Sequence, residues 1–221
     1  MAASFIQHAV EFLPILLRGA VVTIEVTALA FVLSSVIGLV LALMKVSSLR
    51  AVALAGSTVI NLIRGLPIIV QLFYIYFVLP DFGVQLSAFQ AGVIGLGIAY
   101  SAYQAENFRA GIEAVDAGQL EAAQAMGMRM PLIMRRVILP QAFRIALPPY
   151  GNTLVMMLKD SSLVSTITVA EMTRTGQLIA SSTFQNMTVY TLVALLYLLM
   201  SLPLVYGLGR LERRLDAGKS R

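Results

Sequence analysis

Four consecutive polar residues follow a long apolar run in the second half of the chain. They are Lys159, Asp160, Ser161 and Ser162, and the apolar run covers about residues 143–158. Charges and unpaired backbone groups at membrane depth cannot face lipid, because they find no partner there. The sequence therefore predicts a broken helix that lines a cavity. A purely structural pairing of Lys159 with Asp160 is the alternative.

A second acidic residue, Glu106, lies near the end of another apolar run, at about residues 86–108. A carboxylate so close to an apolar region needs a partner if it is buried. Arg109 is one neighbour in the sequence that could supply the positive charge, and a cationic substrate is another. Glu106 and Asp160 are therefore the acidic candidates for a substrate pathway.

Several kinds of active site are excluded by residue type. The chain has no cysteine, and its single histidine, His8, offers no cluster for a metal. No phosphate loop of the pattern G-x-x-x-x-G-K-[ST] occurs, and no histidine base stands beside a nucleophile. We therefore expect no enzyme activity, no metal and no cofactor in this chain. If the function of the chain depends on ATP, a partner must bind the ATP and its Mg²⁺.

The composition is that of a membrane protein. Of 221 residues, 58% are hydrophobic and only 12% are charged, and the mean hydropathy is +0.84. Several membrane helices in one domain are expected from such values. The pI of 9.7 does not indicate nucleic acid, because the basic residues lie beside apolar runs and do not alternate with aromatic residues.

The apolar runs predict an all-α integral membrane protein with a single domain, residues 1–221. Residues 1–18, with Pro14 inside, predict an amphipathic segment at the membrane interface. Pro67 is expected to kink the second span, and residues 171–181 predict a surface helix. Five transmembrane helices are predicted at about residues 19–44, 57–79, 86–108, 143–158 and 189–208.

A charged segment rich in small residues, 121–140, separates the third span from the fourth. Its alanines favour a helix, and Glu121 in the first turn would suit the positive end of the helix dipole. Gly127 is where this helix should end, and Pro131 suits the start of a second helix. Two short helices joined by an elbow are therefore predicted outside the lipid.

This segment resembles the EAA loop of the membrane-spanning subunits of ATP-binding-cassette importers. The family pattern is E-A-A, three residues, G, nine residues, I, one residue, L-P, and Val137 stands here in place of the isoleucine. The resemblance implies that the loop, residues 116–140, docks on an ATP-hydrolysing subunit. The matching residues are Glu121, Ala122, Ala123, Gly127, Leu139 and Pro140.

Three further stretches resemble permeases for polar amino acids, the histidine, glutamine and arginine permease family. They are RGLPIIVQLFYIYFVLP at 64–80, AYQAENFRAGIEAVDAGQLEAA at 102–123 and KDSSLVSTI at 159–167. Leu66 replaces the usual threonine. The resemblance, over nearly the whole chain, implies the type I importer permease fold and makes Asp160 the best candidate to contact a substrate amino group.

The distribution of basic residues predicts the orientation. With the N-terminus outside and five crossings, thirteen of the sixteen Lys and Arg residues lie on or near one side. Arg18 and Arg174 lie on the other side, and Lys159 is internal. Basic residues favour the cytoplasmic side, so the C-terminus and the loop at residues 116–140 are predicted to be cytoplasmic. The family resemblance implies that the membrane is a bacterial inner membrane.

The family resemblance implies alternating access driven by ATP hydrolysis on a partner. The implied partners are two ATP-binding subunits, a second permease that is identical or similar, and an extracytoplasmic amino acid binding protein. Two acids favour a cationic substrate, although one could instead recognise the α-amino group common to all amino acids. An ion-gradient-driven carrier with Glu106 and Asp160 as titrating sites is the alternative, and a membrane scaffold is a third possibility.

Overall fold

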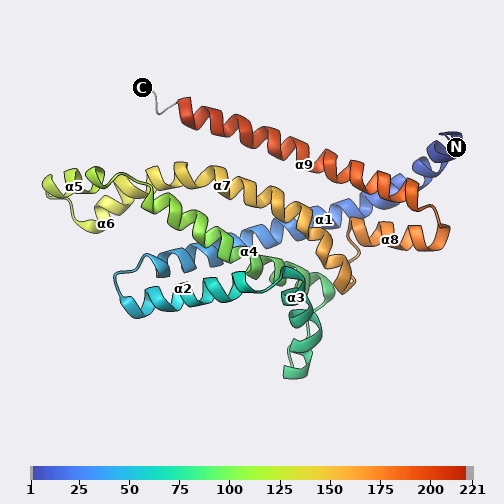
Figure 1. Cartoon of the computed structure of the whole chain (residues 1–221), viewed down its shortest axis with the longest axis horizontal. Helices are drawn as coiled ribbons and strands as arrows, with labels where there is room; N and C mark the ends of the chain where they lie inside the picture. The colour runs from blue at the N-terminus through green and yellow to red at the C-terminus, as the bar shows by residue number, and fades with distance from the viewer. Residues whose placement is uncertain (1, 218–221) are drawn as a thin grey trace.

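Long helices lie side by side along the molecule and are joined by short turns (Figure 1). The structure, a computed structural model, describes residues 2–217, and every regular element within this range is helical, which confirms the predicted all-α class. In chain order the elements are α1 (Ala2–Lys45), α2 (Arg50–Gly65), α3 (Ile68–Phe73), the π-helix η1 (Tyr74–Val78), the 3-10 helix η2 (Leu79–Phe82), α4 (Ala88–Glu113), α5 (Ala117–Ala125), α6 (Met130–Ile133), the π-helix η3 (Met134–Ile138), α7 (Leu139–Asp160), the 3-10 helix η4 (Ser161–Ile167), α8 (Met172–Thr183) and α9 (Asn186–Ala217).

Helix α4 is the centre of the bundle and packs against α1, α2 and α7. Small residues let α1 and α4 approach closely. A Cβ atom added at Gly38 of α1 would lie 2.6 Å from Gln104 Cβ, and one added at Gly97 of α4 would lie 2.6 Å from Leu33 Cδ2. Close packing of this kind holds membrane helices together, since burial from lipid gives little hydrophobic drive.

Length and composition identify two described helices that could each cross a membrane, Phe5–Lys45 and Asn186–Leu215. The number rises to four if each of two sharply bent helix pairs counts as one span. Helix α4 is not among them, and its buried face carries polar residues such as Ser101 and Gln104. The predicted count of five spans is therefore not confirmed.

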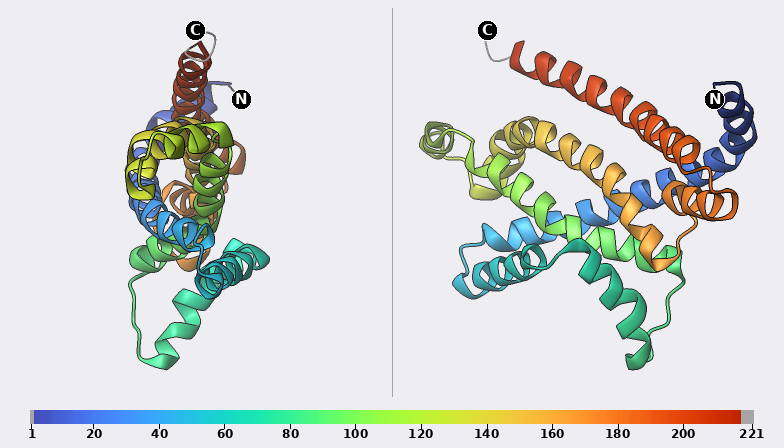
Figure 2. Two further views of the ribbon diagram at one scale, coloured as in Figure 1. Left: turned by 90° about the vertical axis from the view of Figure 1, so that its left-hand side faces the viewer. Right: turned by 45° about the vertical axis from the view of Figure 1, so that its right-hand side comes forward.

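The second predicted span, residues 57–79, is not one straight helix. Arg50–Gly65 and Ile68–Phe82 meet at an angle of 98°, and Figure 2 shows α3 leaving the bundle sideways. Leu66 is extended, with φ −108° and ψ 136°, as expected for a residue before a proline. Pro67 thus produces a stronger break than the predicted kink.

Residues 2–18 are continuous with the first predicted span, so the sequence prediction of a separate segment at 1–18 does not describe this helix. Helix α1 runs through Pro14 without a break. Phe12 and Leu16 are buried against α8 and α9, and this packing offsets the hydrogen bond that Pro14 removes.

The two ends of the bundle differ. Figure 1 shows the α5–α6 elbow and the α1–α2 turn at one end, and α8 at the other. The C-terminal half of α9 runs towards the elbow end but leans away from the bundle (Figure 2). Segments predicted to be cytoplasmic therefore share one end of the molecule. Lys219 and Arg221, which belong to the predicted basic tail, lie outside the described residues.

Candidate substrate and coupling sites

Helix α5 ends at the predicted glycine. Gly127 has φ +74°, a left-handed conformation that favours glycine. Its N–H donates to the carbonyl of Gln124 at 2.9 Å, and the N–H of Met128 donates to the carbonyl of Ala123 at 3.1 Å. These two bonds form a Schellman motif, which closes a helix sharply. The elbow therefore has a fixed shape.

The start of α5 differs from the prediction. The helix begins at Ala117, where the side chain of Asp116 accepts a hydrogen bond from the N–H of Gly118 at 2.7 Å. Asp116, and not Glu121, thus lies at the positive end of the helix dipole, because Glu121 falls in the second turn. Pro131 lies in the first turn of α6, as predicted.

The residues predicted to couple the permease to an ATPase divide into two groups. Ala123 is buried against Ile133 and Ile138, and so holds α5 against α6 and η3. The other five are exposed on the elbow and at the start of α7: Glu121, Ala122, Gly127, Leu139 and Pro140.

Asp160 is the last residue of α7, where the helix gives way to the 3-10 helix η4. The hydroxyl group of Tyr100, on α4, donates a hydrogen bond to Asp160 Oδ2 at 2.7 Å. Lys159 is exposed, and the ion pairs found among residues 2–217 do not include one between Lys159 and Asp160. The α-helix thus changes to a 3-10 helix at Asp160, the predicted cavity beside it stays a prediction, and the alternative of a Lys159–Asp160 ion pair is not found among the described residues.

The two serines after Asp160 differ in their surroundings. Ser161 is fully buried, and its hydroxyl group donates to the carbonyl of Leu158 at 2.7 Å. Ser162 is half-buried. Ser161 therefore stabilises the end of α7, and Ser162 is the more accessible of the two.

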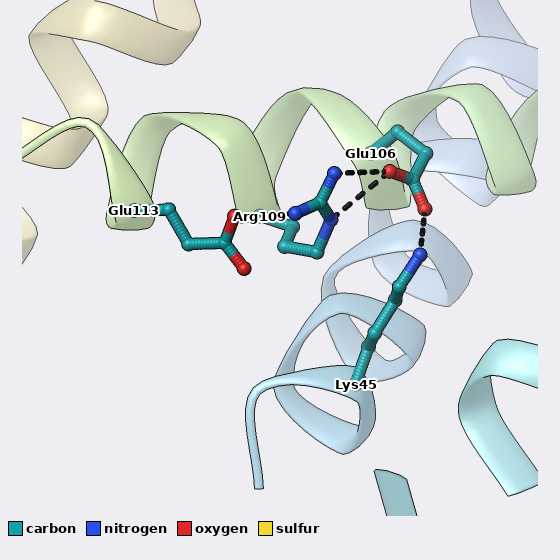
Figure 3. Close-up of polar contacts among 4 residues, drawn as sticks. All are labelled: Lys45, Glu106, Arg109 and Glu113. Carbon is teal, nitrogen blue, oxygen red and sulfur yellow. Dashed lines mark hydrogen bonds and ion pairs between the residues drawn. The ribbon is translucent and has the colours of Figure 1, made fainter. Parts of the chain in front are cut away.

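Glu106 lies in a chain of ion pairs at the elbow end (Figure 3). Lys45 Nζ, at the end of α1, lies 2.5 Å from Glu106 Oε1, and Arg109 Nη2 lies 2.7 Å from Glu106 Oε2. Arg109 also pairs with Glu113. Arg109 lies beyond the predicted span, and its hydrogen bonds to Glu106 and then Glu113 raise the pKa of its guanidinium group. The cluster therefore joins the ends of α1 and α4.

The predicted partner Arg109 is present beside Glu106, whereas Lys45 was missed. Lys45 closes the first predicted span and Arg109 follows the third, on the same predicted side of the membrane. Their position on the same predicted side of the membrane was the sequence feature that could have indicated a cluster with Glu106. Glu106 does not contact Asp160: it lies six positions after Tyr100, the hydrogen-bond partner of Asp160, about 9 Å further along α4.

The sequence analysis also missed Glu171, which is 0% exposed at the N-terminus of α8. Its carboxylate accepts hydrogen bonds from the N–H groups of Thr173 and Arg174 and from the hydroxyl groups of Thr23 on α1 and Tyr197 on α9. Glu171 therefore joins three helices at the end opposite the elbow. The one signal was its place as the first residue of the helix predicted at 171–181; the structure makes it the N-cap instead, although glutamate is not a preferred capping residue.

Known proteins resemble the chain over most of its length. The family model described as "Binding-protein-dependent transport system inner membrane component" matches residues 34–217. A probable amino-acid ABC transporter permease protein of Sinorhizobium fredii is 38% identical over 197 residues, covering 89% of this chain and 85% of the relative. The L-cystine transport system permease protein of Bacillus subtilis is 39% identical, covering 93% and 88%.

Solved structures agree on the fold. A crystal structure of an amino acid ABC transporter with histidines superposes with a TM-score of 0.88 at 43% identity, covering 93% of this chain and 96% of that chain. An inward-facing methionine ABC transporter, MetNI, superposes with a TM-score of 0.77 at 21% identity. The chain therefore belongs to the family of binding-protein-dependent transport system inner membrane components, the membrane permeases of ATP-binding-cassette transporters, as the resemblance predicted.

Proposed function

We propose that the chain is the permease subunit of an importer for polar amino acids, cationic ones included, that works by alternating access. ATP hydrolysis on two partner subunits drives the cycle, a second permease completes the pathway, and an extracytoplasmic binding protein delivers the substrate. The relatives named for amino acid transport support the substrate class. The exposed elbow between α5 and α6 is the observation that carries the proposal.

The elbow is built as a docking surface. Met126 at its tip is 82% exposed, Met130 is 52% exposed, and Arg129 between them is exposed. Large apolar side chains that project from a membrane protein into water indicate a protein partner. The family's EAA residues lie on the same elbow, and this supports a nucleotide-hydrolysing subunit as that partner.

The path from the elbow to the substrate runs through two helices. Three residues separate the end of α4 from the start of α5, and α7 follows η3 without a gap. Helix α4 carries Tyr100, and α7 ends at Asp160. A displacement of the elbow therefore acts on both partners of this hydrogen bond. The shift is productive only if the ATPase contacts the two states of the permease differently.

Asp160 is the proposed contact for the substrate amino group, with Lys159, Ser161 and Ser162 beside it. Glu106 is the second acidic residue proposed on the pathway. Lys45 and Arg109 already donate to both of its oxygens, so a cationic substrate would have to share Glu106 with two cations. Asp160 is therefore the first contact that we propose.

The coupling role can be tested at Gly127. A side chain there meets open space, since no atom lies within 4 Å of an added Cβ. Gly127→Trp would therefore place bulk on the docking surface without a steric clash, although the left-handed backbone at φ +74° is strained for residues with a side chain. We expect the reconstituted complex to insert normally and to lose ATP-dependent uptake. Labelled L-arginine, L-histidine and L-glutamine in proteoliposomes with the ATPase and binding protein provide the measurement.

Gly127→Asn is the matched control, because asparagine tolerates the left-handed conformation better than most residues. It should retain uptake. Uptake at the wild-type rate by Gly127→Trp would refute the coupling role.

The ion-gradient-driven carrier is the less favoured function, since Glu106, one of its two titrating residues, is held in ion pairs. Uptake that persists without ATP and stops when the ion gradients collapse would support the carrier instead.

A further inference from the structure

Tyr100 is a buried tyrosine whose hydroxyl group reaches the proposed substrate contact. Its side chain is 1% exposed, and it lies in an apolar cluster with Val26 of α1, Leu72 of α3 and Met157 of α7. From this cluster its hydroxyl group donates to Asp160 Oδ2 at 2.7 Å. The ring is thus fixed by packing from three helices, and the hydroxyl position is fixed with it.

The hydrogen bond uses one of the two carboxylate oxygens. Within residues 2–217, Tyr100 is the donor found for the Asp160 side chain, and it reaches Oδ2. An ionised carboxylate has room for several donors, so Oδ1 keeps its capacity for the N–H groups of an ammonium ion. Asp160 is half-buried, so a substrate can approach it while Tyr100 stays behind it.

We propose that Tyr100 is a positioning residue for substrate binding, which orients the Asp160 carboxylate so that its second oxygen receives the amino group of the transported amino acid. The proposal rests on the proposed function, in which Asp160 contacts that amino group. Binding through a pre-oriented group is tighter, because the side chain does not lose its freedom when the substrate arrives.

The neighbouring tyrosine, Tyr103, provides a comparison that separates the effect of the Tyr100 hydroxyl group on Asp160 from the effect of an aromatic ring. Tyr103 lies on the same helix, with its ring centre 5.8 Å from that of Tyr100. It is 37% exposed and packs under the guanidinium group of Arg64. Its hydroxyl group makes no hydrogen bond to another described residue, unlike that of Tyr100. The two positions therefore form a matched pair.

The test is equilibrium binding of labelled L-arginine, L-histidine and L-glutamine to the purified permease–ATPase complex without the binding protein. Tyr100→Phe keeps the ring and removes the hydrogen bond, and we expect Kd to rise about tenfold, as for the loss of a hydrogen bond to a charged group. Tyr103→Phe should keep the wild-type Kd. The melting temperature of each complex separates loss of binding from loss of folding.

Asp160→Asn and the double variant with Tyr100→Phe complete a mutant cycle. If Tyr100 acts through Asp160, the double variant binds no more weakly than Asp160→Asn alone, since coupled residues are not additive. An unchanged Kd in Asp160→Asn would refute Asp160 as the contact, and with it the proposed site. A raised Kd in Asp160→Asn with an unchanged Kd in Tyr100→Phe would refute the positioning role alone. Equal effects of Tyr100→Phe and Tyr103→Phe, or additive effects in the cycle, would also overturn it.

Discussion

The carboxylate of Glu106 accepts hydrogen bonds from cations on two helices. Lys45 at the end of α1 holds one oxygen, and Arg109 on α4 holds the other with two N–H groups. The Glu106 side chain is 20% exposed, whereas Glu113 at the outer end of the same chain of ion pairs is 55% exposed. Partial burial makes the inner pairs worth more than the outer one, because water screens exposed charges.

Replacing Glu106 and Glu113 in turn should separate what the inner and the outer ion pairs contribute to the stability of the complex. Glu106→Gln weakens charge-assisted bonds worth about 1.5 kcal/mol, which corresponds to a fall of about 3–6 °C in melting temperature for a chain of this size. Glu113→Gln is the control and should lower the melting temperature by less than about 2 °C. Thermal unfolding of the purified complex measures both. Equal falls would contradict a link between α1 and α4 through Glu106.

At this scale the sequence identified the acidic residues and one local partner, Arg109 of Glu106, but not the distant partners. Asp160 and Glu106 stand out because charges beside apolar runs are costly. The partners that were missed lie far away in the chain: Tyr100 is 60 positions from Asp160, and Lys45 is 61 positions from Glu106. Thr23 is 148 positions from Glu171. Such pairs form only when helices pack, and spacing along one helix cannot predict them.

Among the elements, the bend between α2 and α3 shows how a broken helix is stabilised. The bend frees backbone carbonyl groups from their usual helical partners. Gln71 Nε2 donates to the carbonyl of Ile63 at 2.9 Å and to that of Leu66 at 3.0 Å. Because an unpaired carbonyl in an apolar environment is costly, this one side chain makes the 98° bend tolerable.

Gln71→Leu should therefore destabilise the complex. The change leaves the carbonyl of Leu66 without its side-chain donor, and leaves that of Ile63 with only the N–H of Leu66 at 3.4 Å. The cost of about 1–3 kcal/mol predicts a fall of at least about 2 °C in melting temperature. Gln7→Leu, at an exposed position of α1, is the control for the added apolar surface. If both variants melt at the wild-type temperature, Gln71 does not support the bend.

Element boundaries were predicted well where local residues decide them and poorly where packing decides them. Gly127 and Pro131 marked the elbow correctly because turn geometry is local. Pro14 did not end a helix, because Phe12 and Leu16 are buried against α8 and α9. Residues 1–18 were predicted to be a separate segment because the sequence does not show which face of a helix packs against another helix.

For the molecule as a whole, α4 and α7 form a unit that connects the elbow to Asp160. Asn107 Nδ2 on α4 donates to Thr153 Oγ1 on α7 at 2.9 Å and to the carbonyl of Pro149 at 3.3 Å. Gly111 lies so close to α7 that an added Cβ would be 2.7 Å from the carbonyl oxygen of Ala142. Two helices packed this tightly should move together.

A cross-link between them tests this rigid unit. The chain has no cysteine, so Asn107→Cys with Thr153→Cys introduces the only thiol pair. We expect the complex cross-linked with a short bis-thiosulfonate, which joins the two thiols through reducible disulfide bonds, to keep ATP-dependent uptake of labelled L-arginine, L-histidine or L-glutamine. Each single-cysteine variant, treated with the same reagent, controls for the side-chain changes. Uptake lost on cross-linking and recovered with reductant would mean that α4 and α7 slide past each other.

The polar buried face of α4 has a consequence for how the protein is made. With Ser101 and Gln104 fully buried, α4 would be a poor substrate for the translocon if it had to enter the bilayer by itself. The ribosome, however, synthesises α1, its main packing surface, before α4 emerges. During insertion, α4 can therefore pack directly against α1, so that its buried polar side chains need not be exposed to lipid acyl chains.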